Sequence, residues 1–394
     1  MSPVSAIPKT MRAVVYRGVN DLRLETVPVP RIGANELLVQ VAVCGVCPTD
    51  IKKIQYGTVA PPRIFGHETA GTIVKTGARV KNFRVGDRVA LHHHVPCLKC
   101  QFCRHASFAQ CATYKRTGIT AGFDPAGGGY AEYVRVMDFV LPGVVKIPAR
   151  NSFAEGAMLE PVNTVLKAVK RLNLLRGDNV LVAGQGPIGL MFTKILQLAH
   201  VNVLATDLMA SRLELAKKFG ARWTCLASEL STFNFQLSTP LDAAIIAVPS
   251  DDAVAQAFQL VRGGGQILLF AHTKRSAPVK SREPEAEGKK LPALDSRPST
   301  LDFASICLDE KDLIGSYSAD FTIQREVARL VFSRQLDVRP LISHRFPLAQ
   351  TADAVALAAH PTPGSLKIIV ENGVTGLPSL IERPANEHRT KIER

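Results

Sequence analysis

Four cysteines at short intervals are the residues of this chain whose chemistry is easiest to predict. They follow the spacing C-x2-C-x2-C-x7-C, at Cys97, Cys100, Cys103 and Cys111. On a tight loop this spacing gathers four thiolates around one point, and four soft thiolates in tetrahedral reach suit a structural Zn²⁺ or, less often, iron. The spacing alone does not separate an enzyme from a zinc-ribbon nucleic-acid binder, so the other motifs must decide.

A second group of metal-binding residue types lies nearer the N-terminus. Cys47 is followed further along by His67 and Glu68. Cys and His are good zinc ligands, and Glu adds an oxygen; three protein ligands with water or substrate in the fourth position leave zinc open for catalysis. The third ligand is either Glu68 or a residue from elsewhere, such as Glu160, which lies where a β-rich region gives way to a different pattern.

A glycine motif follows a short strand-like run at 179–183. Its residues, in the order G-x-G-x-x-G, are Gly184, Gln185, Gly186, Pro187, Ile188 and Gly189. The first glycine permits a tight turn, the second lets the backbone approach a pyrophosphate, and the third allows close packing of helix on strand. The N-terminus of the following helix offers free N–H groups to the phosphates, which predicts a dinucleotide site.

Asp207 ends the next predicted strand, 18 residues after Gly189. A carboxylate there accepts hydrogen bonds from the adenosine ribose hydroxyls of NAD and repels the 2'-phosphate of NADP. The alternative is that Asp207 caps the helix expected from Ser211. Arg212 argues the other way, since a nearby Arg tolerates a 2'-phosphate. The motif and the acid together predict NAD in preference to NADP.

The elements that must position these residues are of two kinds. The N-terminal part has short strand patterns at 11–16, 36–43 and 70–74, separated by Gly, Pro and Asn. From about Val162, helix-length and strand-length segments alternate, which predicts a parallel, doubly wound sheet. The expected strands are 179–183, 201–206, 242–248, 266–270, 312–317 and 366–370, and the expected helices are 187–198, 211–219, 251–261 and 321–332. The predicted fold class is therefore α/β.

Length and composition exclude several classes of protein. The chain of 394 residues is 46% hydrophobic, enough for two or three domains with sizeable cores. Its net charge of +14 is spread along the chain without interleaved aromatic residues, so a solvated basic surface is favoured over a nucleic-acid partner. We find no secretory pattern and no apolar run of roughly 18 residues, so no membrane association is expected. Clustered cysteines in such a chain indicate reduced, metal-binding thiols and a cytoplasmic location.

Taken together, the motifs resemble the zinc-dependent medium-chain alcohol dehydrogenase family over residues 11–371. The family's zinc signature is similar to the spacing of Gly66, His67, Glu68, Gly71, Gly77 and Val80, and its structural zinc lobe is similar to the four spaced cysteines. Two further runs resemble the sorbitol (L-iditol) dehydrogenase branch: Leu159-Glu160-Pro161 and Ser343-His344-Arg345-Phe346-Pro347-Leu348.

The resemblance implies a domain organisation. A GroES-like β-rich catalytic domain would occupy 1–161, with the structural zinc lobe at about 95–113, and a Rossmann NAD-binding domain would occupy 162–316. Residues 317–394 would return to the catalytic domain and end in a tail from 373. The stretch at about 273–300, rich in charged residues, Pro and Ser, is expected to be a flexible surface insertion. A homo-oligomer, either dimer or tetramer, is also implied.

The resemblance also implies roles for the matching positions. Cys47, His67 and Glu160 would be ligands of the catalytic zinc, and Glu68 would be the carboxylate that binds or exchanges at that metal. The structural zinc would be held by Cys97, Cys100, Cys103 and Cys111. With both sites filled, the chain would carry two zinc ions.

Three other matching positions would serve the substrate and the cofactor. Thr49 would take the proton of the substrate alcohol, and Asp50 would orient the metal-bound histidine by fixing its tautomer and ring angle. Lys367 would reach the cofactor pyrophosphate. The remaining cofactor contacts would come from Gly184, Gly186, Pro187, Ile188, Gly189, Asp207 and Arg212.

Two features depart from the family pattern or add to it. Lys52 stands where many members have a histidine that releases the proton to solvent, which disfavours a threonine substrate. His92, His93 and His94 are consecutive; on a strand their side chains would alternate between faces, so they cannot all bind one ion, and we predict a structural role for them.

The expected reaction is the reversible oxidation of a secondary alcohol, in a polyol or sugar alcohol, to a ketone, with hydride transferred to NAD⁺. Zinc would lower the pKa of the bound hydroxyl. Other substrates on the same fold would be an amino alcohol such as threonine, a sugar phosphate or an aromatic alcohol. A zinc-ribbon nucleic-acid binder is the alternative from another class, and it leaves the glycine motif and the Cys47/His67 pair unexplained.

Overall fold

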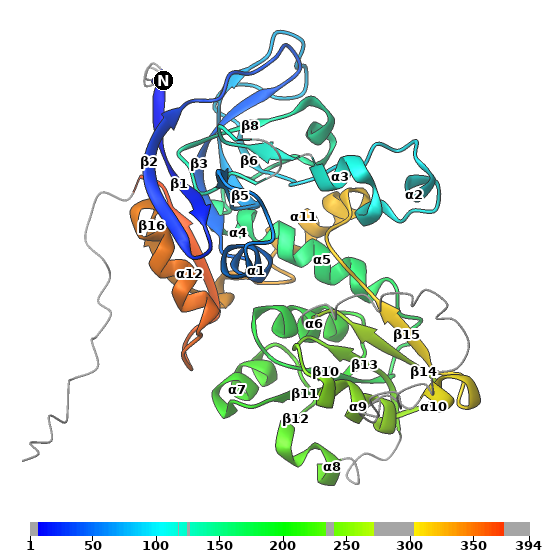
Figure 1. Cartoon of the computed structure of the whole chain (residues 1–394). Coiled ribbons are helices and arrows are strands. Elements are labelled where there is room, and N and C mark those ends of the chain that lie inside the picture. The colour runs from blue at the N-terminus through cyan, green and yellow to red at the C-terminus, as the bar shows by residue number, and fades with distance from the viewer. Residues whose placement is uncertain (1–6, 117, 124–126, 234–239, 272–302, 374–394) are drawn as a thin grey trace, which may run out of the picture.

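The computed structural model describes residues 7–116, 118–123, 127–233, 240–271 and 303–373. The predicted insertion at 273–300 lies outside these residues, and so does the predicted tail from 373 except for its first residue. Figure 1 shows two lobes: one, rich in strands, contains the N-terminal and the last described elements, and the other contains the central part of the chain. Within the described residues, no helix has both the length and the apolar character needed to cross a membrane.

The first lobe is built on an eight-stranded sheet. Its main path runs, in order, β16 (Ile342–Pro347), β17 (Lys367–Glu371), β3 (Leu37–Gly45), β5 (Glu68–Thr76), β6 (Arg88–Ala90) and β9 (Val145–Lys146). Two more strands join it, β7 (Ile119–Thr120) and β8 (Tyr133–Val136), with β8 paired to β3. A smaller sheet comprises β2 (Asp21–Pro28), β1 (Thr10–Gly18) and β4 (Arg63–Ile64). Strand β17 pairs antiparallel with β3, so the last strand belongs to the N-terminal sheet.

The second lobe is a six-stranded sheet in which all neighbouring strands are parallel. Its order is β12 (Trp223–Leu226), β11 (Asn202–Asp207), β10 (Asn179–Ala183), β13 (Leu241–Ile246), β14 (Val261–Leu269) and β15 (Asp312–Gly315). All five residues of β10 are buried, as expected of a strand covered by helices on both faces. The crossing helices are α6 (Pro187–Leu198), α7 (Ala210–Lys218), α8 (Leu230–Phe233), α9 (Asp251–Leu260) and α10 (Phe303–Leu308).

The two lobes share one apolar core. It includes Val43 and Ala70 from the first lobe, Val180 and Val203 from the second, and much of helix α5 (Leu159–Val169). Helix α5 lies between the lobes and packs on α6 and α11 (Gln324–Phe332). The remaining helices all belong to the first lobe: α1 (Pro48–Tyr56), α2 (Gln101–Arg104), α3 (Ala112–Arg116), α4 (Phe153–Ala157) and α12 (Thr351–Ala359). The two lobes are therefore joined by a continuous apolar interior.

Most predicted elements are confirmed, and the differences have local causes. The predicted strand at 266–270 is part of a longer strand, β14, which begins at Val261. Three consecutive glycines, Gly263 to Gly265, interrupt the apolar pattern there and hide the first half of the strand. The predicted helix at 321–332 begins with a 3₁₀ turn at Phe321–Ile323, capped by the Asp320 side chain, which accepts a hydrogen bond from the Thr322 N–H.

Candidate active site and metal centres

The four spaced cysteines meet as predicted, on a loop folded by α2 and α3. Their sulfur atoms all lie within 4.8 Å of one another. The Sγ–Sγ distance is 3.5 Å between Cys100 and Cys103 and 3.9 Å between Cys97 and Cys103. Four sulfurs bound tetrahedrally at about 2.3 Å from zinc would be separated by about 3.8 Å. All eight cysteines of the chain are free thiols, so this donor set fits a closed zinc site.

The charge state of the loop also suits a metal. Burial raises the pKa of the Cys111 thiol, but hydrogen bonds from the backbone N–H groups of Cys97 and Tyr114 outweigh this and lower the pKa to about 6. Thiolate is the form of cysteine that binds metal. The loop thus stabilises negative charge on the Cys111 sulfur.

The pairing of β3 with β5 assembles the second metal-binding group. Gly45, at the end of β3, pairs with Glu68, at the start of β5. Cys47, two residues beyond β3, therefore meets His67 and Glu68, and the ligand atoms of these three side chains all lie within 4.8 Å of one another. A Cβ at Gly45 would lie 1.9 Å from Glu68 Oε2, so the close approach requires glycine. A thiolate, an imidazole and a carboxylate form a donor set that fits catalytic zinc.

Asp50 lies behind the histidine of this group. Asp50 is buried, its Oδ2 is 3.1 Å from His67 Nδ1, and the same oxygen accepts a hydrogen bond from the Gly66 N–H at 3.2 Å. With Nδ1 bound to the carboxylate, Nε2 is the His67 nitrogen left for a metal. Although burial opposes it, the negative charges of Asp50 and Cys47 hold the pKa of His67 well above its usual value. The site therefore favours positive charge, which Zn²⁺ would supply.

Lys367 lies in the same site. Its Nζ donates to Glu68 Oε1 at 2.6 Å and to the Val46 carbonyl at 2.9 Å, and both charged side chains are buried. Burial lowers the pKa of Lys367, but Glu68 more than compensates and the pKa is raised. The structure thus places the Lys367 ammonium group on the Glu68 carboxylate, whereas the role expected from the sequence was contact with the cofactor pyrophosphate.

Glu160 lies in the first turn of α5 and is buried. Burial raises its pKa to about 7. It is not one of the three residues whose ligand atoms lie within 4.8 Å of one another. Its Oε1 is 3.5 Å from His93 Nδ1, and the His93 ring is centred 5.3 Å from the His67 ring. Glu160 and His93 thus form the side of the site next to His67.

The prediction that the three consecutive histidines lie on a strand is wrong, because β6 ends at Ala90. The interpretation of His93 as purely structural also missed its position. Ala70 pairs with Ala90, and the Leu91 N–H donates to the Thr69 carbonyl. Continuing this antiparallel register places residue 93 beside residue 67. The strand pairing was the signal that could have located His93.

Thr49 lies in the first turn of α1, between Cys47 and Asp50, and is half-buried. Helix α1 begins at Pro48, which is well suited to a first helical position. The turn therefore carries a metal-binding thiol, a hydroxyl and the carboxylate behind His67 within four residues.

The glycine motif forms the turn from β10 into α6. Gly184 has a φ of +92°, and a Cβ there would lie 2.3 Å from Val248 Cγ1, while a Cβ at Gly189 would lie 1.7 Å from the Gly184 carbonyl oxygen. Both positions require glycine for packing. No heavy atom lies within 4 Å of a Cβ built on Gly186, which precedes the first residue of α6, Pro187. Gly186 therefore faces open space, as a turn that receives a pyrophosphate must.

Asp207, the last residue of β11, is tied to that turn. One carboxylate oxygen accepts from the Gln185 N–H at 2.7 Å, and the other accepts from the Met209 N–H at 2.9 Å. Arg212 Nη1 lies 3.7 Å from the carboxylate. Helix α7 begins at Ala210, after an N-cap residue, Met209, whose side chain makes no capping bond. The structure thus brings Asp207 and Arg212 together beside the glycine turn.

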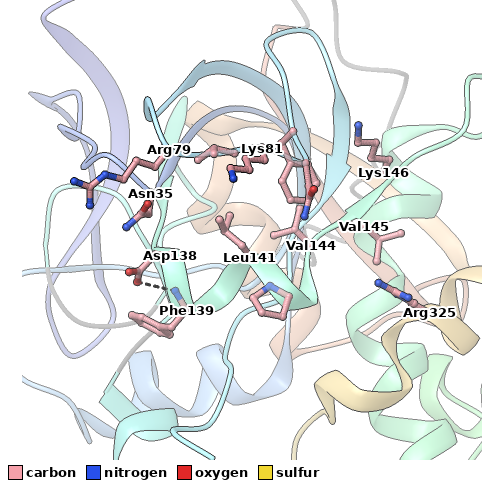
Figure 2. A pocket seen from close by; sticks show the side chains of 14 residues that line it. Asn35, Arg79, Lys81, Asp138, Phe139, Leu141, Val144, Val145, Lys146 and Arg325 are labelled. Atoms are coloured by element: carbon pink, nitrogen blue, oxygen red, sulfur yellow. Dashed lines mark hydrogen bonds between the residues drawn. The ribbon is translucent and has the colours of Figure 1, made fainter.

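Two surface cavities differ in their relation to the predicted site. One, of about 1250 Å³, lies at the carboxyl ends of β13, β14 and β15, where ligands bind in parallel sheets; its lining includes Val248, Phe270, Ser316 and Tyr317. The other, of about 930 Å³, lies on the first lobe (Figure 2). Its lining contains none of the predicted site residues and combines apolar side chains with Arg79, Lys81, Lys146 and Arg325.

Comparison with known proteins gives two family matches. Residues 33–149 match the alcohol dehydrogenase GroES-like domain, and residues 187–332 match the zinc-binding dehydrogenase family. The chain is 28% identical to the sorbitol dehydrogenase of Bombyx mori over 366 residues, covering 91% of this chain and 99% of the relative. It is 28% identical to the sorbitol dehydrogenase of Bacillus subtilis (strain 168) over 377 residues, covering 92% of this chain and 98% of the relative.

A solved structure has the same architecture. It is described as a short chain alcohol dehydrogenase (rspB) from Escherichia coli CFT073 complexed with NADH. The TM-score is 0.78 at 25% identity, and the match covers 92% of this chain and all of the other. The predicted combination of a GroES-like domain with a Rossmann-like parallel sheet is confirmed.

Proposed function

Since the chain belongs to the zinc-binding dehydrogenases, with a GroES-like domain followed by a dinucleotide-binding domain, we propose that it oxidises a secondary alcohol of a polyol to a ketone and transfers the hydride to NAD⁺. The observation that carries this proposal is the group of Cys47, His67 and Glu68, whose ligand atoms lie within 4.8 Å of one another with Asp50 behind the histidine.

In this proposal Cys47, His67 and Glu68 hold the catalytic zinc, with Glu160 close by. Bound there, zinc lowers the pKa of the alcohol hydroxyl that coordinates it. Asp50 fixes the His67 ring through Nδ1, and the Thr49 hydroxyl relays the proton that the alcohol loses, passing its own hydrogen on toward solvent as it accepts the new one. A bound nicotinamide ring would take the hydride from the same carbon, so the alcohol would lose a proton and a hydride and become a ketone. Cys97, Cys100, Cys103 and Cys111 hold a second, structural zinc.

The cofactor would lie along the carboxyl ends of the parallel strands. Gly186 offers open space for the pyrophosphate, and the helix behind it supplies backbone N–H groups. Asp207 supports NAD over NADP, because the carboxylate carries a negative charge and Arg212 is already paired with it. Lys367 holds the Glu68 carboxylate at the proposed metal site through a hydrogen bond from its Nζ.

Polyols are favoured as substrates by the similarity to sorbitol dehydrogenases over about nine-tenths of the chain. A cytoplasmic location is supported by the cysteines, because all eight are free thiols and some of them lie in two groups that could bind a metal ion, as is usual where thiols stay reduced. A homo-oligomer, dimer or tetramer, is supported by β15, which lies at the end of the strand order and pairs only with β14 within the described residues.

The test is NADH formation, followed by absorbance, with purified protein of measured zinc content. The substrates are polyols, monohydric secondary alcohols, threonine, aromatic alcohols and sugar phosphates, with NADP⁺ run in parallel. Two zinc ions per chain and NAD-dependent oxidation of a polyol are expected. One zinc per chain with no turnover of any alcohol would overturn the proposal.

A further inference from the structure

The cavity on the first lobe is lined by none of the residues assigned to the metals, the substrate or the cofactor. It has a volume of about 930 Å³, and its walls come from residue 35, the connection between β5 and β6 at 79–83, the segment 138–146 and the start of α11 (Figure 2). Segments this far apart in the sequence are brought together by the fold of the whole lobe. The volume lies within the range of roughly 300–1,000 Å³ that small-molecule sites occupy.

The apolar part of the lining is anchored from behind. Phe83, Phe139 and Leu141 are half-buried and pack against the core of the first lobe, to which the buried Val144 belongs. Part of their remaining surface lines the cavity. Because the core already holds these side chains in place, a ligand that covers them removes apolar area from water at little cost in side-chain entropy.

Positive charge dominates the rest of the lining. Within the described residues its one carboxylate is that of Asp138, whose Oδ1 accepts a hydrogen bond from the Phe139 N–H at 2.7 Å. The cations of the lining are Arg79, Lys81, Lys146 and Arg325. Such an excess of cations attracts an anion to the cavity.

One of these four cations is already neutralised. Lys146 Nζ lies 2.8 Å from Asp87 Oδ2, whereas Arg79, Lys81 and Arg325 make no ion pair within the part of the chain that the structure describes. In Figure 2 the Lys81 side chain projects over the middle of the cavity, and the Arg325 side chain enters it from α11. Lys81 is therefore the cation best placed to meet an anionic group, and the two arginines add to the positive field.

From this combination we propose that the cavity binds a small organic anion with an apolar body, such as a medium-chain carboxylate. The Lys81 ammonium group pairs with the anionic group, and the apolar body covers Phe139 and Leu141. The anchored apolar surface favours this ligand over a purely polar polyanion, which would leave that surface exposed to water. The site is additional to the proposed reaction and does not depend on it.

The test is calorimetric titration of the full, zinc-loaded chain with octanoate in the presence of NADH. Two further probes separate the two parts of the recognition. Octanamide has the same carbon chain without the charge, and hexaglutamate has the charge without the apolar body. Octanoate should bind more tightly than either probe, and its affinity should fall as salt is added. The titration involves no turnover, so its result is independent of the proposed reaction.

Substitutions locate the binding. Lys81→Met should weaken octanoate binding about two- to fivefold, as for one exposed ion pair, and leave octanamide binding unchanged. Lys81→Glu should weaken octanoate binding further. Leu141→Gln makes the apolar surface polar and should weaken the binding of both probes about three- to tenfold. Lys218→Met removes an exposed cation from α7 in the second lobe; it is the matched control and should bind octanoate like the unmodified protein.

The melting temperature of each variant shows whether it is folded, and the exposed Lys81 position still decides the question if Leu141→Gln is not. Absence of octanoate binding, or hexaglutamate binding as tight as that of octanoate, would overturn the proposal. So would octanoate binding that Lys81→Glu leaves unchanged. If such binding were lost in Cys47→Ser instead, octanoate would occupy the proposed catalytic metal site and not the cavity.

Discussion

Asp50→Asn is the substitution whose effect on the catalytic metal is best defined by the structure. The Asp50 side chain is 2% exposed, lies 3.1 Å from His67 Nδ1, and accepts the Gly66 N–H at 3.2 Å through the same oxygen. Asparagine keeps the shape and one acceptor oxygen but removes the negative charge. Partners that orient a metal-bound histidine typically change metal affinity by about 10–100-fold. That range corresponds to about 1.4–2.8 kcal/mol of binding free energy.

Zinc affinity is measured by competition with a chromophoric chelator, with the cysteine loop as an internal reference. We expect the affinity of one of the two zinc ions to fall in Asp50→Asn, while the other is unchanged. Asp353→Asn, which alters an exposed carboxylate on α12, is the control and should behave like the unmodified protein. If Asp50→Asn bound both zinc ions with unchanged affinity, the carboxylate would not be orienting the ligand and the reasoning would be refuted.

Three further substitutions test other parts of the structure. Cys100→Ser should reduce the zinc content from two ions to one and lower the melting temperature. Cys307→Ser replaces an exposed thiol and should change neither quantity; metal analysis measures the zinc content and calorimetry the melting temperature. Asp207→Asn should lower kcat/KM for NAD⁺ about 10–100-fold and so reduce the ratio of kcat/KM for NAD⁺ to that for NADP⁺. An unchanged ratio would contradict the assignment of Asp207 to the adenosine ribose. Burial raises the pKa of Glu155, but bonds from Ser152, Asn151 and Arg334 outweigh it and lower the pKa below 4.5. Glu155 therefore stabilises the fold above its unfolded pKa and loses that contribution as pH falls through the folded value. Urea unfolding of Glu155→Gln should show a loss of about 1–3 kcal/mol at pH 7 that shrinks toward pH 3, and a loss independent of pH would contradict this sign.

The parts of the fold that could be predicted are those specified by local pattern. The strand at 179–183 and the helix at 187–198 match β10 and α6 residue for residue, because a short run that is apolar after Asn179, a glycine turn and a proline at the first helical position all lie within one short segment. The cysteine loop was predictable for the same reason. Its ligands are so close in sequence that their spacing restricts their geometry.

The parts that could not be predicted depend on contacts between distant segments. His93 was assigned a structural role because consecutive side chains on a strand would alternate between faces. Its place beside His67 follows from the register of β5 with β6, which no local pattern shows. Lys367 was expected at the cofactor, since nothing in its local sequence shows that β17 lies next to β3. The Tyr114 hydroxyl lies 2.5 Å from Ser318 Oγ, but the two residues are 204 positions apart and no local pattern relates them.

The pairing of β17 with β3 has a consequence for the order in which the site is completed during synthesis. Cys47, His67 and Glu68 leave the ribosome early, but the cation that neutralises Glu68 is 299 residues further along the chain. Until β17 is made, the nascent first lobe has an unpaired strand edge and an uncompensated carboxylate that cannot be buried at low cost. A metal ion bound at this stage would meet a site that lacks Lys367. The Glu68 carboxylate is therefore neutralised by its lysine only after the whole dinucleotide-binding lobe has emerged.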